Sequence, residues 1–364
     1  MNFSDFGFFL NSFPVMGIPG YDCIVMHKGK EVFRQMNGYS DRENQIPING
    51  KERYHIYSCS KPITCAAALQ LMEKGAYRLD DLLSDYMPEF EKMTVWSGDQ
   101  IVPAKNQIRI HNLFTMTAGF DYNVASKSMC RAFDETHGAC PTREVMKYLA
   151  CEPLSFEPGA MWSYSLCHDV LAAFVEVVSG MKFQDYVKKY IFDPLGMKNS
   201  TFLLPASEMF TTAPIYRKDD NSSYIYRLSA HENFKHLYRI GAEYASGGAG
   251  CVSTVEDYIL FLEALRKGDV ILKKETVDLM TSNHLTVAQE ETYWNKGFHH
   301  YGLGVRCPLP GRSTDFGWGG AAGAHLAVDR QHEFSIFYAQ HVLNSPNRQL
   351  RIFMSDYVRK AIYQ

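Results

Sequence analysis

A serine and a lysine stand three residues apart where an extended segment turns into a helix, in the run Tyr57-Ser58-Cys59-Ser60-Lys61-Pro62. Residues 54–57 are predicted to form a short strand, and residues 63–74 carry apolar side chains at helical spacing. Proline is tolerated in the first turn of a helix, so Pro62 supports a helix that opens at Ser58. Residues three apart share one helix face, which puts the Lys61 ammonium within reach of the Ser58 hydroxyl.

This pair has the chemistry of a nucleophile and its base. A serine hydroxyl is a poor nucleophile unless a neighbour takes its proton. A lysine can do so only in its uncharged form, which burial and the positive end of a helix both favour. The Ser58 backbone N–H at the same helix start is available to an oxyanion. On its own, however, this spacing is more often that of an N-capping serine beside a solvated lysine.

Two later segments follow in the order of a known signature set. Serine enzymes that recognise penicillin combine S-x-x-K with an S-D-N and a K-T-G element. Here Glu157-Pro158-Gly159 leads to Tyr164-Ser165, directly before a predicted helix over 168–180. Near the C-terminus, the glycine-rich run 316–323 precedes a predicted strand over 325–329.

With these three elements the chain resembles the serine β-lactamase-like family, and in motif it is most similar to the carboxylesterases that share the fold of class C β-lactamases. The similarity extends from about residue 20 to about residue 340 and includes the runs 108–119 and 247–254. It implies an α+β fold with an antiparallel β-sheet flanked by helices. Residues 1–78 and 243–364 would form the sheet lobe, residues 79–242 an inserted, mostly helical lobe, and the active site would lie in the cleft between them.

The resemblance also implies roles for single residues. Ser58 corresponds to the acylated nucleophile, Lys61 to its proton acceptor, and Tyr164 to the phenol that shares the proton with the lysine and passes it to the leaving group. The oxyanion hole is expected from the backbone N–H groups of Ser58 and Ala321. The alternative for Tyr164 is a core aromatic, and the alternative for the glycines before Ala321 is a plain β-bulge.

Departures from the β-lactamase pattern bear on the substrate. Trp318 stands where a β-lactamase presents a lysine, and Leu166 stands where the family has an asparagine. We therefore expect Trp318, Gly319, Gly320 and Leu166 to form a rather apolar substrate pocket. This favours a serine hydrolase that cleaves small carboxylic esters through a Ser58 acyl-enzyme, with transfer of the acyl group to an alcohol as a variant. The alternatives are a β-lactamase or D-amino-acid peptidase of the same fold, or a non-catalytic binding or sensing relative.

Composition sets the remaining expectations. A net charge of −3 without clustered basic residues argues against a nucleic-acid or membrane partner, and leaves a small-molecule ester or lactam. Nine cysteines without a C-x-x-C pair are typical of reduced thiols in a cytoplasmic protein. No cofactor and no metal are expected, because the groups His231/His236, His299/His300 and His332/His341 lack the spacing of metal ligands.

The two ends of the chain are expected to meet in the sheet. Residues 1–19 carry Asp5 and lack a basic start, so they are predicted to form a first helix rather than a signal peptide. Ser253 and Glu256 have the spacing of a capping box for a helix that runs through Leu265. The predicted strands are 21–26 and 31–37, as a hairpin, followed by 301–306, 325–329 and 334–340, and a closing helix is predicted over 350–362.

Overall fold

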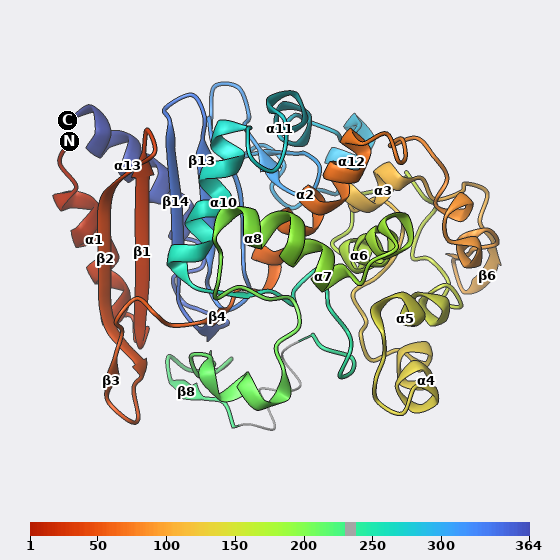
Figure 1. Ribbon diagram of the computed structural model, residues 1–364, viewed down its shortest axis with the longest axis horizontal. Coiled ribbons are helices and arrows are strands. Elements are labelled where there is room, and N and C mark those ends of the chain that lie inside the picture. Colours follow the sequence, from red (N-terminus) through yellow and green to blue (C-terminus); the bar gives the residue numbers. More distant parts are fainter. Residues whose placement is uncertain (230–237) are drawn as a thin grey trace.

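The centre of the molecule is an eight-stranded antiparallel sheet, seen in the computed structural model, which describes residues 1–229 and 238–364 (Figure 1). Its strand order is β10-β11-β12-β13-β14-β1-β2-β3, so the N-terminal hairpin lies beside the last long strand of the chain. The strands are β1 (Gly20–His27), β2 (Lys30–Asp41), β3 (Ile46–Pro47), β10 (His300–Tyr301), β11 (Arg306–Cys307), β12 (Phe316–Gly319), β13 (His325–Asp329) and β14 (Phe334–Ala339).

One face of this sheet is covered by the two terminal helices, α1 (Ser4–Val15) and α13 (Met354–Tyr363) (Figure 1). Successive side chains of a strand point to opposite faces, so Cys23 packs with these helices while Ile24 belongs to the core on the other side. The N–H of Asn2 donates to the carbonyl of Ala361 at 3.0 Å. The two ends of the chain therefore meet on this face.

The other face is covered by α10 (Val255–Lys267) and, beyond it, by the buried helix α2 (Ser60–Glu73) (Figure 1). Almost every side chain of α2 from Ser60 to Leu71 is buried, so this helix lies inside the molecule rather than on its surface. The other helices are α3 (Ile110–Phe114), α4 (Lys127–Glu135), α5 (Thr142–Leu149), α6 (Cys167–Ser179), α7 (Phe183–Val187), α8 (Asp193–Leu195), α11 (Lys274–Met280) and α12 (Val287–Glu290).

Three small sheets complete the fold. The pair β4 (Tyr54–His55) and β9 (Val252–Ser253) joins the segment before Ser58 to the glycine-rich segment before α10. The others are the hairpin of β5 (Thr94–Ser97) with β6 (Gln100–Pro103), and the sheet β15 (Val342–Leu343), β7 (Tyr216–Lys218), β8 (Ile225–Arg227). Short 3₁₀ turns cover Tyr57–Cys59, Leu83–Asp85, Pro88–Phe90, Ala206–Thr211 and Arg351–Phe353, and one π-helical turn covers Lys188–Phe192.

The expected fold class is confirmed, whereas one predicted strand and one predicted helix cap are wrong in this part of the fold. The strand predicted over 301–306 is divided between β10 and β11, because the chain turns at Gly302 and Gly304, the latter with φ of 85°. The cap of α10 is Thr254, whose hydroxyl accepts from the Asp257 N–H at 3.1 Å, one residue after the predicted Ser253. Ser253 instead bonds Ser200.

The predicted lobe boundaries stay a prediction. The segment 79–242 contains the strands β5 to β8 as well as helices, and a single core cluster includes residues from both predicted lobes. His231 and His236 lie outside the described residues.

All nine cysteines are free thiols, and only Cys130 and Cys151 among them are exposed. In residues 1–229 and 238–364, no helix has the length and apolar character needed to span a lipid bilayer.

Candidate active site

Ser58 lies in the 3₁₀ turn Tyr57–Cys59 that connects β4 to α2. The α-helix begins at Ser60, two residues later than predicted. Tyr57 has a φ of 48°, a left-handed conformation that costs a non-glycine residue about 1–3 kcal/mol and persists only where its surroundings fix it. The buried Tyr57 ring packs edge-on against Tyr238, with centroids 6.2 Å apart. The turn that presents Ser58 is thus held in place by packing.

The structure brings the three predicted catalytic side chains together. Tyr164 Oη donates to Ser58 Oγ at 2.5 Å, and Lys61 Nζ lies 3.4 Å from the same oxygen. Lys61 Nζ also lies 4.4 Å from the centroid of the Tyr164 ring. Ser58 and Tyr164 are half-buried, so the serine oxygen can be reached from the cleft. This is the geometry that a serine needs to lose its proton to a neighbour.

Lys61 is fully buried, at 0% exposure, beneath this pair. Its shortest contact is to the carbonyl oxygen of Gly248, at 2.7 Å, and it also lies 3.3 Å from Tyr122 Oη. The rings of Tyr122 and Tyr164 stack with centroids 5.3 Å apart and an interplanar angle of 8°. All acceptors around this ammonium group are therefore uncharged.

The third element lies against the segment before Ser58. A Cβ on Gly320 would lie 2.3 Å from the carbonyl oxygen of Ile56, so only glycine allows this approach. The turn that follows is closed by the Gly320 N–H, which donates to Ala324 O at 2.8 Å. Among the described residues, the backbone N–H groups of Ser58 and Ala321 have no hydrogen-bond partner. Both are free to bind an oxyanion.

Tryptophan rings pack beside Tyr164. Trp318 is buried in β12 and lies nearly parallel to Tyr164, with centroids 6.1 Å apart. Trp294, which is 53% exposed, contacts both of these rings and lies at the rim. The indole of Trp318 therefore lies in the lining of the cleft, and its role in binding substrate stays a prediction.

A cavity of about 460 Å³ contains Ser58, Tyr164 and the residues 318–321 in its lining. The same lining includes four arginines, Arg217, Arg306, Arg348 and Arg351, and no acidic residue among the described residues. The cavity is therefore more cationic than the rather apolar pocket that the sequence led us to expect. The sequence pattern showed only the loss of a lysine at position 318. Arg306 comes from the strand that pairs with the third element, at Gly317, and the other three arginines come from segments outside the three motifs.

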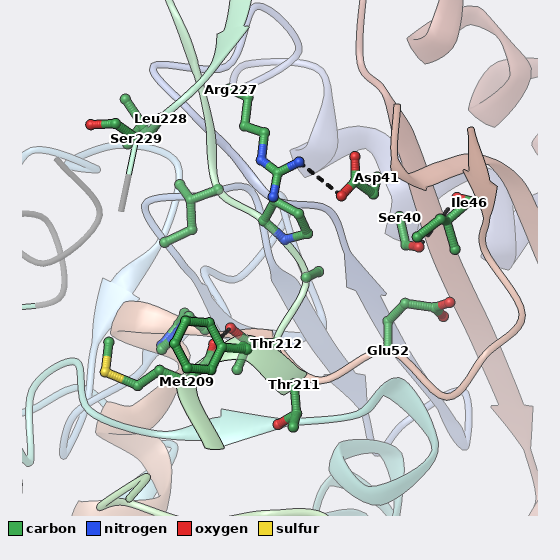
Figure 2. Close-up of a pocket in the computed structure, with 15 residues that line it drawn as sticks. Ser40, Asp41, Ile46, Glu52, Met209, Thr211, Thr212, Arg227, Leu228 and Ser229 are labelled. Carbon is green, nitrogen blue, oxygen red and sulfur yellow. Dashed lines mark hydrogen bonds and ion pairs between the residues drawn. The ribbon is translucent and has the colours of Figure 1, made fainter. Parts of the chain in front are cut away.

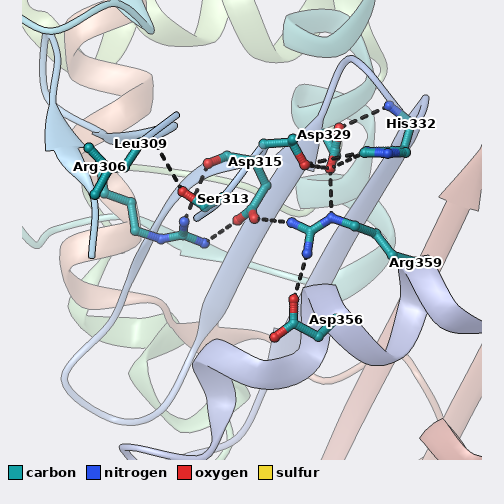
Figure 3. A network of polar contacts seen from close by, with 9 residues as sticks. Arg306, Leu309, Ser313, Asp315, Asp329, His332, Asp356 and Arg359 are labelled. Atoms are coloured by element: carbon teal, nitrogen blue, oxygen red, sulfur yellow. Dashed lines mark hydrogen bonds and ion pairs between the residues drawn. The ribbon is translucent and has the colours of Figure 1, made fainter. Parts of the chain in front are cut away.

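Two of the four arginines have an acidic partner. Arg306 bonds Asp315 at 2.6 Å in a network that continues through Arg359 to Asp329 and Asp356 (Figure 3). Arg217 pairs with Asp220 at 3.0 Å. In the described part of the chain, Arg348 and Arg351 form no ion pair; Arg351 donates to the carbonyl of Ala324 at 3.3 Å.

Leu166 is not brought to the cleft. It is 2% exposed, belongs to the main core cluster and precedes α6, so its side chain does not line the cavity. His325, which follows the third element, does line it. Burial, together with Arg306 and Arg351, lowers the pKa of His325 well below its ordinary value, so this imidazole is neutral.

A second cavity, of about 680 Å³, lies apart from Ser58 between β2, the segment 209–215 and β8 (Figure 2). Its walls include the Arg227–Asp41 ion pair at 2.8 Å, with Glu52 nearby. None of the predicted site residues lines it. Across the described ranges 1–229 and 238–364, no cluster of three His, Cys, Asp or Glu side chains is placed to hold a metal ion.

Sequence reasoning missed Tyr122, Gly248, Trp294 and the cleft arginines. Gly247-Gly248 did stand out as part of a glycine-rich segment, and a glycine pair indicates close approach of other groups to the backbone. A Cβ on Gly248 would indeed lie 2.5 Å from Asp169 Oδ2 and 3.3 Å from Lys61 Nζ. Tyr122 belongs to no recognisable motif and reaches Lys61 only through the tertiary fold.

Known proteins resemble this chain in sequence and in structure. A family model described as Beta-lactamase matches residues 14–357. Esterase EstB of Burkholderia gladioli is 27% identical over 344 residues, which cover 87% of this chain and 84% of that protein.

Two solved structures share the fold along almost the whole chain. EstCE1, described as a hydrolase with promiscuous acyltransferase activity, gives a TM-score of 0.79 at 24% identity and covers 98% of this chain and 96% of its own. Unliganded simvastatin synthase (LovD) of Aspergillus terreus gives a TM-score of 0.81 at 22% identity, with 98% of each chain covered. The fold implied by the sequence motifs is therefore confirmed.

Proposed function

Since this chain belongs to the β-lactamase family, we propose that it is a serine esterase that forms an acyl-enzyme at Ser58 and can pass the acyl group to water or to an alcohol. The observation that carries the proposal is the position of Ser58 Oγ, which is 2.5 Å from Tyr164 Oη and 3.4 Å from Lys61 Nζ. The names of the relatives support the same class, since one is an esterase and another a hydrolase with acyltransferase activity.

In the proposed acylation, neutral Lys61 takes the Ser58 proton, with Tyr164 sharing it, and the serine oxygen forms a bond to the ester carbonyl carbon. The carbonyl oxygen becomes an oxyanion that the N–H groups of Ser58 and Ala321 stabilise. The carbon–oxygen bond to the alcohol then breaks, and Tyr164 returns the proton to the leaving oxygen. The acyl-enzyme and a free alcohol result.

In the proposed deacylation, water or an acceptor alcohol attacks the acyl carbon while the same lysine and tyrosine accept its proton. The bond to Ser58 Oγ breaks, and the serine regains a proton. The half-open rim at Trp294 would admit either acceptor. The nine free thiols lead us to propose a cytoplasmic location for this reaction.

The first test is labelling with a fluorophosphonate, which phosphonylates activated serines. We expect one label, at Ser58, located by peptide mass spectrometry, and none after Ser58→Ala. Lys61→Ala should slow labelling sharply because the hydroxyl loses its proton acceptor. Ser223→Ala, at an exposed serine, is the control and should label normally. A protein that takes no label, or that labels equally well without Lys61, would favour a non-catalytic binding role.

A second candidate, hydrolysis of a β-lactam or a D-amino-acid peptide, is favoured by one observation. Arg348 and Arg351 line the cleft without an acidic partner in the described chain, and guanidinium groups bind carboxylates well. Trp318 and the absence of a lysine at its position favour neutral esters instead. We therefore expect short p-nitrophenyl esters to be cleaved much faster than a chromogenic cephalosporin. Efficient cephalosporin turnover with negligible ester cleavage would reverse this order.

A further inference from the structure

Lys61 is a buried ammonium group without an acidic neighbour in direct contact. Among the described residues it forms no ion pair, and its acceptors are the Gly248 carbonyl, the Tyr122 phenol and the Ser58 hydroxyl. An isolated charge is costly in such a place, because nothing replaces its lost hydration. Any group that offsets the charge of Lys61 must therefore lie behind the residues that contact Nζ directly.

Such a group comes nearest to Lys61 at Gly248. A Cβ at this position would lie 2.5 Å from Asp169 Oδ2, 3.1 Å from Tyr122 Oη and 3.3 Å from Lys61 Nζ. Asp169 and Lys61 therefore both contact the space that a side chain at 248 would fill. The missing side chain lets the Asp169 carboxylate, the Tyr122 hydroxyl and the Lys61 ammonium group gather around the Gly248 backbone.

Asp169 also fixes the segment that carries the Gly248 carbonyl. It lies in the first turn of α6, is 1% exposed, and its Oδ1 accepts from Ser246 Oγ at 2.6 Å and from Tyr244 Oη at 3.0 Å. Ser246 Oγ in turn accepts from the Ala249 N–H at 3.0 Å. Asp169 thus holds Tyr244 and Ser246 directly and, through Ser246, the backbone of Ala249. These contacts fix the short run whose Gly248 carbonyl binds Lys61.

The other titratable groups near Lys61 are neutral around pH 7. Apart from Tyr164, whose hydroxyl donates to Ser58 Oγ, they are the phenol of Tyr122, the thiols of Cys59, Cys65 and Cys167, and the imidazole of His168. Burial, with Lys61 beside it, lowers the pKa of His168 to about 3, and burial raises the pKa of Cys167 to about 11.

Asp169 is the remaining titratable group. Burial raises its pKa, while the Ser246 hydrogen bond, Lys61 and the Tyr244 hydrogen bond oppose that rise. Its place in the first turn of α6 also favours the ionised form.

We propose that Asp169 is a positioning residue for Lys61: it holds the 244–248 segment whose Gly248 carbonyl binds Nζ, and its negative charge stabilises the positive charge that Lys61 gains on taking the Ser58 proton. This inference rests on the proposed function, since it assigns a partner to the base of the same site. It predicts that the protonation of Lys61, and not only the stability of the loop, depends on Asp169.

The test is Asp169→Asn, which keeps the size of the side chain and an acceptor for Ser246 and Tyr244 but removes the charge. The rate of fluorophosphonate labelling at Ser58 is measured against pH. Without the nearby anion, Lys61 loses its proton at lower pH. The acidic limb of the pH profile, over which the labelling rate rises with pH, should therefore shift to lower pH by about one to two units, the size typical of a close opposite charge. A purely structural role would lower the rate equally at every pH.

Asp257→Asn is the matched control, because Asp257 is another buried carboxylate that accepts from backbone and hydroxyl donors, here Asn199 and Ser200. It should leave the midpoint of the limb unchanged. If Asp169→Asn does not fold, Ser246→Ala replaces it: losing this donor destabilises ionised Asp169 and should move the limb in the same direction by less.

The outcomes separate the two proposals. If the unmodified protein neither labels nor hydrolyses esters, the proposed function is wrong and this inference falls with it. If the unmodified protein labels normally but the limb keeps its midpoint in folded Asp169→Asn, or in Ser246→Ala where that variant is used, only the inference is overturned.

Discussion

Two buried cations of this molecule are held in opposite ways. Arg306, at the sheet end of the cleft, is bonded directly to the carboxylate of Asp315 at 2.6 Å, and Arg359 binds the other oxygen of that carboxylate at 2.5 Å. Lys61, buried beneath Ser58 and Tyr164, contacts only uncharged acceptors. Burial alone therefore does not decide how a cation is accommodated.

The difference follows from what each cation can do. A guanidinium group does not lose its proton in a protein, and the permanent charge of Arg306 is offset by the carboxylates of the network in Figure 3, whereas the equally buried Arg351, within the described residues, contacts only the carbonyl of Ala324. An ammonium group can lose its proton, and neutral acceptors leave both states accessible. The contrast separates a structural cation from one that is suited to act as a base.

The largest expected effect tests the chemical side of this comparison. Lys61→Met removes the base but fills its space with an apolar chain, so kcat/KM for a p-nitrophenyl ester should fall by about 100- to 10,000-fold. The melting temperature should not fall, because a buried group without an ionic partner has been replaced by an apolar one. Lys74→Met, at an exposed lysine at the end of the same helix, should retain the rate. Near-normal ester cleavage by Lys61→Met would show that Lys61 is not the base, so that the contrast with Arg306 has no catalytic meaning.

The next effect tests the structural side. Asp315→Asn leaves Arg306 buried without its carboxylate, so the free energy of unfolding should fall by about 3–5 kcal/mol, measured by urea denaturation. A loss below about 1 kcal/mol would show that this network stabilises no more than a surface pair does. Asp356→Asn is the smaller-effect control, because Asp356 is largely exposed and its pair with Arg359 should contribute under about 1 kcal/mol.

The same variant has an expected pH dependence. Burial raises the pKa of Asp315, but Arg306 and Arg359 outweigh it, so the net pKa lies below the ordinary value. A lowered carboxyl pKa contributes stability that is complete above the pKa of the unfolded chain, about 3.9, and is lost as the pH falls through the folded value. The difference in the free energy of unfolding between the unmodified protein and Asp315→Asn should therefore be constant near neutral pH and become smaller in acid.

The parts of the site that could be predicted from sequence are those built by local spacing. Ser58 and Lys61 share one turn, so their spacing alone indicated the pair, whereas Tyr164 and Ala321 were indicated by the resemblance of their motifs to those of the family. The hairpin of β1 and β2 likewise follows from the turn residues 27–30 between two strand-forming segments, and β13 and β14 follow from short apolar runs.

What could not be predicted depends on packing between distant segments. Tyr122 reaches Lys61 from a loop without a motif, and Arg351 reaches the cleft from a short 3₁₀ turn near the C-terminus. Asp169 looks in sequence like any acidic residue in the first turn of a helix. Leu166 was assigned to the cleft because of its place in the motif, but its backbone begins α6 and its side chain is directed into the core. Spacing fixes neighbours along the chain, and it does not fix the direction of a side chain at an irregular boundary.

The distribution of thiols has a practical consequence. Seven of the nine cysteines are buried, and the two exposed ones, Cys130 in α4 and Cys151 after α5, both lie in the helical part of the molecule. A maleimide dye would react with these two in the folded protein, since thiol reactivity requires access to solvent. The unmodified chain can therefore carry a fluorescent label on its helical part alone, without any substitution. Such a label would report movement of the helical part relative to the sheet during turnover.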